Sequence, residues 1–130
     1  MALHPLRRLG KIARVIVATY QSASGGGAGM MRRLEAETRA YLEGRPAEPS
    51  PLPEPYAFNV FSHNTPIGAD GQNEEERKVV EETRKILAEP TLKLGVTCVR
   101  VPVLRAHTEA VTIEFADAEP SVEAARQVLS

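Results

Sequence analysis

Three stretches of the chain carry apolar residues in the patterns that β-strands show. Residues 12–20, IARVIVATY, are rich in β-branched side chains and predict a buried strand. Residues 94–103 predict a second strand, and residues 109–116 predict a third in which apolar and polar side chains alternate. We therefore expect a sheet at the centre of the fold.

The first strand is followed by a pattern typical of a helix. Residues 21–29, QSASGGGAG, predict a turn of small residues. Apolar residues then recur at helical spacing until Gly44 and Pro46, which predict the end of the helix. The side chains expected on its buried face are Met31, Leu34, Thr38, Tyr41 and Leu42.

Two further helices are predicted by their capping residues. Asn73, with Glu76 three positions later, has the pattern of a capping box. Ser121 predicts the N-cap of a last helix that reaches Leu129. The buried face expected for the helix after Asn73 consists of Val79, Val80, Thr83, Ile86 and Leu87.

The connections complete the predicted order of elements. Residues 47–55 contain four prolines and predict an extended segment, and residues 58–71 predict a long ordered loop. The order is then strand, helix, long loop, helix, strand, strand, helix. The predicted fold class is α/β (α+β), a mixed β-sheet with helices packed on it.

Composition narrows the possible functions. The 130 residues are 42% hydrophobic and 25% charged, which is typical of one globular domain. A net charge of −1 argues against a nucleic-acid partner, and no apolar run is long enough to span a membrane. Cys98 is the only cysteine, which fits a cytoplasmic location, and its spacing from His4 and His63 predicts no metal site.

Arg100 and His107 are the most informative residues, and they lie seven positions apart in CVRVPVLRAH. An arginine within an apolar strand needs an anionic partner, either a structural carboxylate or a bound substrate. An imidazole can move a proton near neutral pH, although His107 could also be an ordinary loop histidine. Together they predict a site that holds an acidic substrate while a proton is transferred.

Other residues give weaker signals. Cys98 could form a nucleophilic dyad with His107, but a cysteine in a buried strand is more often a small apolar filler. Glu75 and Lys78 could clamp an ammonium group and a phosphate, or form an ordinary solvated ion pair. Gln21 could orient a substrate carbonyl or merely end the strand, and the glycine-rich turn fits no nucleotide motif.

Four segments together resemble aspartate-β-semialdehyde dehydrogenases. They are VIVATYQSASG, FNVFSHN, NEEERKVVEETRKIL and CVRVPVLRAHTEAV, in the order found in that family. The family has an N-terminal Rossmann domain and a C-terminal domain that binds substrate and forms the dimer. The resemblance implies that residues 1–130 are this C-terminal domain, incomplete at both ends and without the NADP-binding Rossmann domain.

The resemblance also implies a reaction and its partners. The family reduces L-aspartyl-4-phosphate to L-aspartate 4-semialdehyde with NADPH and releases phosphate, in the biosynthesis of lysine, threonine and methionine. A cysteine thiolate attacks the acyl phosphate, hydride from NADPH follows, and an imidazole acts as acid and base. The implied assembly is a homodimer or a larger homo-oligomer, with neither nucleic acid nor membrane as a partner.

Four positions take catalytic or cofactor roles from the resemblance. His107 matches the acid/base, and Gln21 matches the active-site glutamine. Ser24 and Gly25 match a backbone stretch that touches the cofactor.

Three further positions match residues that bind substrate. Arg100 matches the arginine that holds the substrate carboxylate. Glu75 matches the carboxylate that meets the substrate amine, and Lys78 matches the lysine that helps bind phosphate. For Glu75 and Lys78 the resemblance therefore favours the clamp over the solvated pair.

One departure from the family pattern concerns the nucleophile. The N-C-[ST]-T motif is absent, and Cys98 occupies a strand position that the family does not use for chemistry. We therefore expect a fragment, whose first residues MALHPL resemble the tail of a helix, with no dehydrogenase activity by itself. The alternatives are an enzyme similar to N-acetyl-gamma-glutamyl-phosphate reductase and a non-catalytic dimerisation domain.

Overall fold

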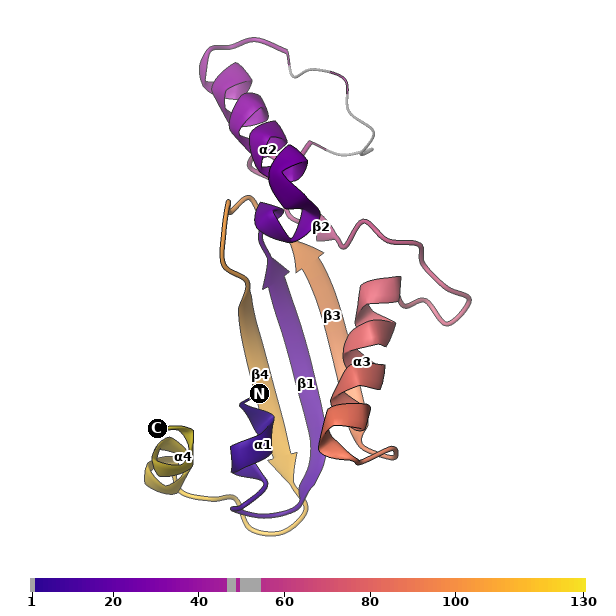
Figure 1. Ribbon diagram of the computed structural model, residues 1–130, viewed down its shortest axis with the longest axis vertical. Coiled ribbons are helices and arrows are strands. Elements are labelled where there is room, and N and C mark those ends of the chain that lie inside the picture. Colours follow the sequence, from indigo (N-terminus) through magenta and orange to yellow (C-terminus); the bar gives the residue numbers. More distant parts are fainter. Residues whose placement is uncertain (1, 47–48, 50–54) are drawn as a thin grey trace. The chain divides into compact units, whose positions relative to one another are not determined.

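The computed structural model describes residues 2–46, 49 and 55–130 of the chain (Figure 1). The predicted order of the long elements is confirmed, and three short elements, α1, η1 and β2, are added to it. The elements are α1 (Leu3–Leu6), β1 (Ile12–Gln21), the 3₁₀ turn η1 (Ala23–Gly26), α2 (Gly27–Leu42), β2 (Phe61–Ser62), α3 (Glu74–Leu87), β3 (Lys93–Arg100), β4 (Thr108–Phe115) and α4 (Val122–Leu129).

The four strands form one sheet in the order β2-β3-β1-β4. In Figure 1 the arrowheads of β1 and β3 point the same way, and that of β4 points the opposite way. Strand β2 is antiparallel to β3, with Phe61 opposite Arg100 and Ser62 opposite Val99. The predicted mixed sheet is therefore confirmed, but the prediction that residues 58–71 contain no strand is wrong.

The chain divides into two compact units. The first comprises residues 1–17, 78–96 and 111–130, and the second comprises residues 18–77 and 97–110. Helix α3 and the strands β1, β3 and β4 each contribute residues to both units.

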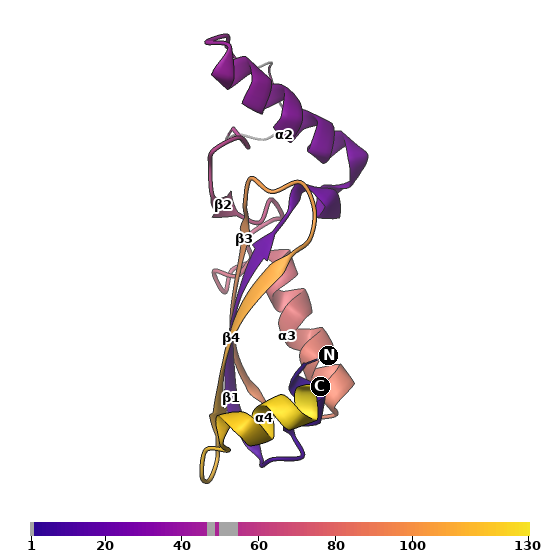
Figure 2. The same ribbon diagram turned by 90° about the vertical axis from the view of Figure 1, so that its left-hand side faces the viewer.

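An aliphatic core holds the first unit together. Val15 and Val17 of β1 pack with Leu87 at the end of α3 and with Leu92, and all four side chains are buried. Helix α4 lies beside α1 in the same unit (Figure 2). Ser121 caps α4 as predicted, because its hydroxyl oxygen accepts a backbone N–H of the first turn at 3.2 Å.

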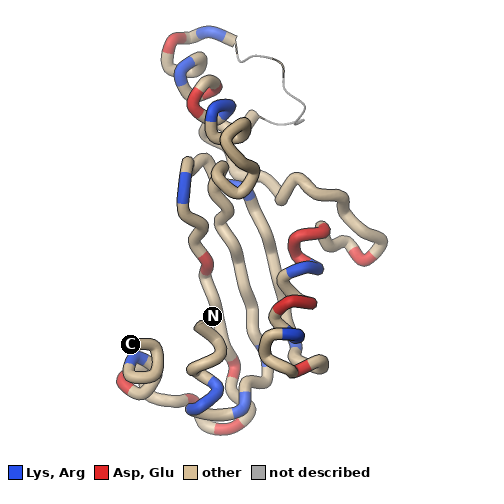
Figure 3. Tube along the Cα trace, in the orientation of Figure 1, with Lys and Arg blue, Asp and Glu red and all other residues tan. Residues whose placement is uncertain are grey.

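Helix α3 begins with the predicted capping box. Asn73 and Glu76 each accept the other's backbone N–H at 2.9 Å. Leu87 is buried as expected, but Ile86 is 65% exposed, so the predicted buried face is only partly correct. Acidic and basic residues alternate along α3 (Figure 3). No helix in the described part of the chain is long and apolar enough to cross a membrane.

Helix α2 ends as predicted, but it buries a different face. Gly44 follows the helix with φ 66°, in the left-handed region that glycine adopts readily. Tyr41 and Leu42 were expected to be buried, yet they are 68% and 73% exposed. The residues that α2 buries are Leu34, Glu37 and Ala40.

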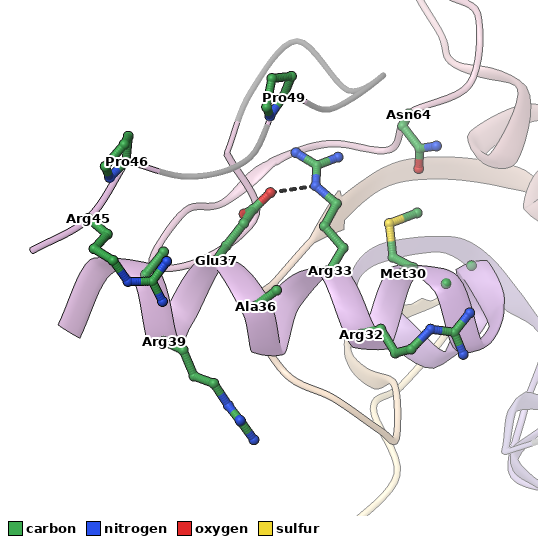
Figure 4. Close-up of a pocket in the computed structure, with 13 residues that line it drawn as sticks. Met30, Arg32, Arg33, Ala36, Glu37, Arg39, Arg45, Pro46, Pro49 and Asn64 are labelled. Carbon is green, nitrogen blue, oxygen red and sulfur yellow. Dashed lines mark hydrogen bonds and ion pairs between the residues drawn. The ribbon is translucent and has the colours of Figure 1, made fainter. Parts of the chain in front are cut away.

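The buried face of α2 differs because Glu37 has strong polar partners. Its carboxylate pairs with Arg33 (Figure 4) and accepts the backbone N–H groups of Tyr56 and Ala57. Burial acts to raise the pKa of Glu37, but the two amides and the Arg33 guanidinium outweigh it and leave the pKa lowered. The carboxylate thus fixes the 56–57 segment against α2.

Several predicted strand boundaries change, and one predicted segment lies mostly outside the described residues. β1 extends to Gln21, and β3 ends at Arg100 rather than at residue 103. The chain turns there, because Val101 donates its N–H to Gln21 at 3.1 Å and then accepts that of Val103 at 2.8 Å. Of the proline-rich segment 47–55, only residues 49 and 55 are described.

Candidate active site

The candidate site is built in the second unit, where β1 ends and η1 begins. Ser22 and Ala23 have no exposed surface. The backbone N–H groups of Ala23 and Ser24 donate to the carbonyl oxygens of Val103 and Leu104 at 2.8 and 3.0 Å. These bonds tie the turn after β1 to the loop between β3 and β4.

His107 stands at the end of that loop and is held through its Nδ1 atom. The backbone nitrogen and the Oγ atom of Ser22 both lie 3.0 Å from Nδ1. Because an amide N–H can only donate, Nδ1 accepts, and the proton of the neutral ring lies on Nε2. Ala106, just before it, has φ 69°, which is uncommon for a residue with a side chain and marks a sharp local turn. His107 itself is exposed and accessible to a ligand.

Gly25 allows His107 and Arg100 to approach the same point. A Cβ atom at this position would lie 2.9 Å from His107 Nε2 and 3.2 Å from Arg100 Nη1. A side chain there would have to shift both groups, so their close approach favours glycine at this position. The imidazole and the guanidinium can therefore contact one small molecule.

Arg100 is 4% exposed at the end of β3, and within the described residues it donates hydrogen bonds to two neutral oxygens. Its Nε donates to Asn64 Oδ1 at 3.1 Å, and its Nη1 donates to the carbonyl oxygen of Ser22 at 3.2 Å. These bonds orient the guanidinium without neutralising its charge. They favour a bound anion over a structural carboxylate as its counter-charge.

The remaining predicted site residues lie on β1, η1 and α3. Gln21 Nε2 donates to Glu75 Oε1 at 3.4 Å, so the structure brings these two side chains together. Ser24 and Gly25 lie in η1, next to the residues that hold His107. Lys78 follows Glu75 by three positions on α3 and belongs to the first unit, whereas the other predicted site residues belong to the second.

Cys98 has the properties of a structural cysteine. It is 1% exposed, and burial raises the pKa of its thiol. The hydroxyl of Thr19 opposes this effect, while the carboxylates of Glu76 and Glu75 add to it. A thiol held in its protonated form is a poor nucleophile, which supports the filler interpretation. In the described part of the chain, no group of three or more His, Cys, Asp or Glu residues could hold a metal ion.

Sequence reasoning missed two residues of the site, Ser22 and Asn64. Both hold Arg100, and Ser22 also holds His107. Asn64 further lines a cavity of about 780 Å³ along α2 (Figure 4). In the sequence, Ser22 is a small polar residue directly after a buried strand, and Asn64 is the amide residue of SHN. Both patterns are common in ordinary turns, so neither pointed to the site.

Comparison with known proteins identifies the family. The family described as "Semialdehyde dehydrogenase, dimerisation domain" matches residues 3–130. The aspartate-semialdehyde dehydrogenase of Synechocystis sp. is 51% identical over 130 residues, which are 100% of this chain and 38% of the relative. The chain thus spans little more than a third of the length of such relatives, and the resemblance seen in the sequence is confirmed.

Solved structures agree with this match. Aspartate semialdehyde dehydrogenase II from Vibrio cholerae, complexed with ASA, has a TM-score of 0.92 and 38% identity, and covers 98% of this chain and 38% of its own. Aspartate semialdehyde dehydrogenase with NADP from Candida albicans has a TM-score of 0.64 and 26% identity, and covers 98% of this chain and 31% of its own. The predicted fold class is confirmed by these neighbours.

Proposed function

Because the chain belongs to the family of semialdehyde dehydrogenase dimerisation domains, we propose that it is the substrate-binding part of an aspartate-semialdehyde dehydrogenase. The proposed reaction is the NADPH-dependent reduction of L-aspartyl-4-phosphate to L-aspartate 4-semialdehyde with release of phosphate, in the cytoplasmic biosynthesis of lysine, threonine and methionine. The observation that carries this proposal is the buried Arg100, which is oriented by neutral partners and lies, like His107 Nε2, against the point where a side chain of Gly25 would begin.

Arg100 is proposed to bind the α-carboxylate of the substrate. A guanidinium has five N–H donors in a planar fork. The bonds to Asn64 and Ser22 use the Nε–H and one N–H of Nη1. The remaining N–H groups of the guanidinium can form a bidentate pair of hydrogen bonds with a carboxylate. The substrate anion would then supply the charge that the two neutral partners lack.

Glu75 and Gln21 are proposed to recognise the rest of the amino-acid backbone. The carboxylate of Glu75 would meet the substrate ammonium group, and the bond from Gln21 holds that carboxylate in place. Gln21 would then also contact the reacting carbonyl group. Lys78, on the same helix as Glu75, is proposed to help bind the phosphate.

His107 is proposed to be the acid/base, acting through Nε2. The nucleophile must come from outside these 130 residues, since Cys98 is the only cysteine and it is buried. NADPH would supply the hydride. Gly25 is exposed and has no side chain, so Gly25 and Ser24 would leave room for NADPH beside His107. We therefore propose that residues 1–130 act together with a nucleotide-binding domain.

A homodimer or larger homo-oligomer is proposed for the assembly. The family description names dimerisation, and apolar side chains remain exposed on two adjacent strands. Ile16 of β1 and Val111 of β4 are 46% and 43% exposed, and a second subunit packed against this face would bury them.

A chimeric enzyme tests the proposal. This chain would replace the matching 130-residue segment of the Synechocystis relative, and NADPH oxidation would be measured with aspartyl phosphate and with N-acetyl-glutamyl phosphate. We expect turnover with the first substrate and none with the second or with the isolated chain. A folded, oligomeric chimera without activity would support a non-catalytic dimerisation domain, and preference for the second substrate would support the reductase alternative.

A further inference from the structure

Ser22 contacts both functional groups of the candidate site through three different polar atoms. Its carbonyl oxygen accepts the Arg100 Nη1–H at 3.2 Å. Its backbone N–H donates to His107 Nδ1 at 3.0 Å, and its Oγ lies at the same distance from Nδ1. With no exposed surface, Ser22 cannot exchange these partners for water. The relative position of Arg100 and His107 therefore depends on one buried residue.

The two groups of Ser22 that contact Nδ1 differ in which protonation state of Nδ1 they can bond to. The backbone N–H can only donate, so it stabilises the ring with a free electron pair on Nδ1. The hydroxyl can donate to an unprotonated Nδ1 or accept from a protonated one by rotating about its Cβ–Oγ bond. Only the hydroxyl can thus remain bonded to Nδ1 when the ring gains or loses a proton there.

This difference matters for proton transfer at Nε2. A neutral ring with its proton on Nε2 can release that proton only if Nδ1 takes up another, which solvent would supply through the hydroxyls of Ser24 and Ser22. When both nitrogens are protonated, Nδ1–H needs an acceptor, and Ser22 Oγ is placed to be that acceptor. After Nε2 gives its proton to the substrate, the proton on Nδ1 stays bonded to the same oxygen.

Ser24 completes the arrangement. Its Oγ lies 2.9 Å from Ser22 Oγ, and either atom can be the donor. When Ser22 Oγ accepts from Nδ1–H, its own hydrogen can point to Ser24 Oγ. When Ser22 Oγ donates to Nδ1, it can accept from Ser24 instead, so the two hydroxyls can reverse direction and keep both bonds of Ser22 Oγ. The bond from the Ser22 backbone N–H is lost while Nδ1 carries a proton.

We propose that Ser22 is a positioning residue for His107 and that its hydroxyl, supported by Ser24, lets Nδ1 carry a proton during turnover. This inference rests on the proposed function, because it gives His107 the role of acid/base. It adds that the Ser22 hydroxyl acts on proton transfer and not on substrate binding. The bond to Arg100 comes from the Ser22 carbonyl oxygen, which a change of side chain leaves in place.

The test uses Ser22→Ala, Ser24→Ala and the control Thr19→Val in the Synechocystis chimera. Thr19→Val removes a buried hydroxyl of β1, one that forms no hydrogen bond with Ser22, Arg100 or His107 in the described chain. Steady-state kinetics give kcat and KM. Nitrogen-15 NMR of labelled histidine gives the protonation of Nδ1 and Nε2, with His107 identified by its absence in His107→Asn.

We expect Ser22→Ala to lower kcat by roughly 10- to 100-fold, the scale of a hydrogen bond to a charged group, with KM changed less than about twofold. The His107 spectrum should shift toward the form protonated only on Nε2. Ser24→Ala should do the same to a smaller extent, and Thr19→Val should do neither.

Three results would overturn the inference. They are an unchanged kcat and spectrum in Ser22→Ala, an equal loss of kcat in Thr19→Val, or a rise of KM without a change of kcat. A chimera with no activity before any substitution would instead contradict the proposed function. The spectra of Ser22→Ala and the parent chimera would still decide whether the hydroxyl controls the proton on Nδ1.

Discussion

The two units of the molecule differ in what they bury. The first unit surrounds an aliphatic core that includes Val15, Val17 and Leu87. In the described chain, the buried polar and charged residues all belong to the second unit, and they are Thr19, Gln21, Ser22, Glu37, His63, Asn73 and Arg100. Burying polar groups contributes little net stability and demands well-placed partners. The second unit also has an apolar cluster, of Ala23, Leu34 and Tyr56. The comparison indicates that the second unit, unlike the first, adds to its apolar core a set of buried polar groups that need well-placed partners.

The largest change of stability is expected at Glu37 in the second unit. Glu37→Gln would remove the negative charge that pairs with Arg33 and weaken the bonds to the amides of Tyr56 and Ala57. Breaking a buried pair from one side costs about 3–5 kcal/mol. Urea unfolding of the chain should show this loss, whereas Glu35→Gln, at an exposed position on the same helix, should change stability by less than about 0.5 kcal/mol.

The pH dependence of stability also tests the contribution of Glu37. Since the pKa of Glu37 is lowered in the folded state, the unfolded state binds its proton more readily. The stabilisation is therefore present above the unfolded pKa of about 4.3 and is lost as pH falls through the folded pKa. Glu37→Gln should flatten the acid limb of the stability curve, and an unchanged limb would show that Glu37 does not drive it.

A somewhat smaller effect is expected in the aliphatic core. Leu87→Ala should lower the free energy of unfolding by about 2–4 kcal/mol, because it leaves a cavity among Val15, Val17 and Leu92. Ile86→Ala is the matched control, since its side chain is 65% exposed on the same helix. Equal losses for the two variants would contradict the assignment of the core.

The smallest effect is expected at Cys98. Cys98→Ser should leave kcat and KM of the chimera within about twofold of the parent. It should lower stability by about 1 kcal/mol, because a hydroxyl replaces an apolar sulfur at a buried position. A large loss of turnover in a folded variant would restore Cys98 as a nucleophile.

Local patterns predicted the elements well where one physical rule dominates. The β-branched run of β1, the capping box of Asn73 and Glu76 and the cap at Ser121 are all confirmed. β2 was missed, because a strand of two residues has no period to detect. The exposure of Tyr41 could not be predicted either, because the buried face of α2 is set by distant amides that contact Glu37.

The site was only partly predictable for a similar reason. Arg100 stood out because a charge within an apolar strand needs a partner, and the structure places it beside His107 across Gly25. Ser22 and Asn64 gave no comparable signal, because they act through a backbone carbonyl and a single amide oxygen whose targets are distant in sequence. Hydrogen bonds of this kind become visible only once the chain is folded.

The most direct test of the central claim compares Arg100→Lys with His107→Asn in the chimera. If Arg100 binds the carboxylate and His107 moves the proton, Arg100→Lys should raise KM and lower kcat, because the planar fork is lost and the substrate is misplaced. His107→Asn should lower kcat by roughly 10²–10⁴-fold with KM nearly unchanged. Near-normal turnover in a folded His107→Asn enzyme would contradict the account, and His107 would then be an ordinary loop histidine.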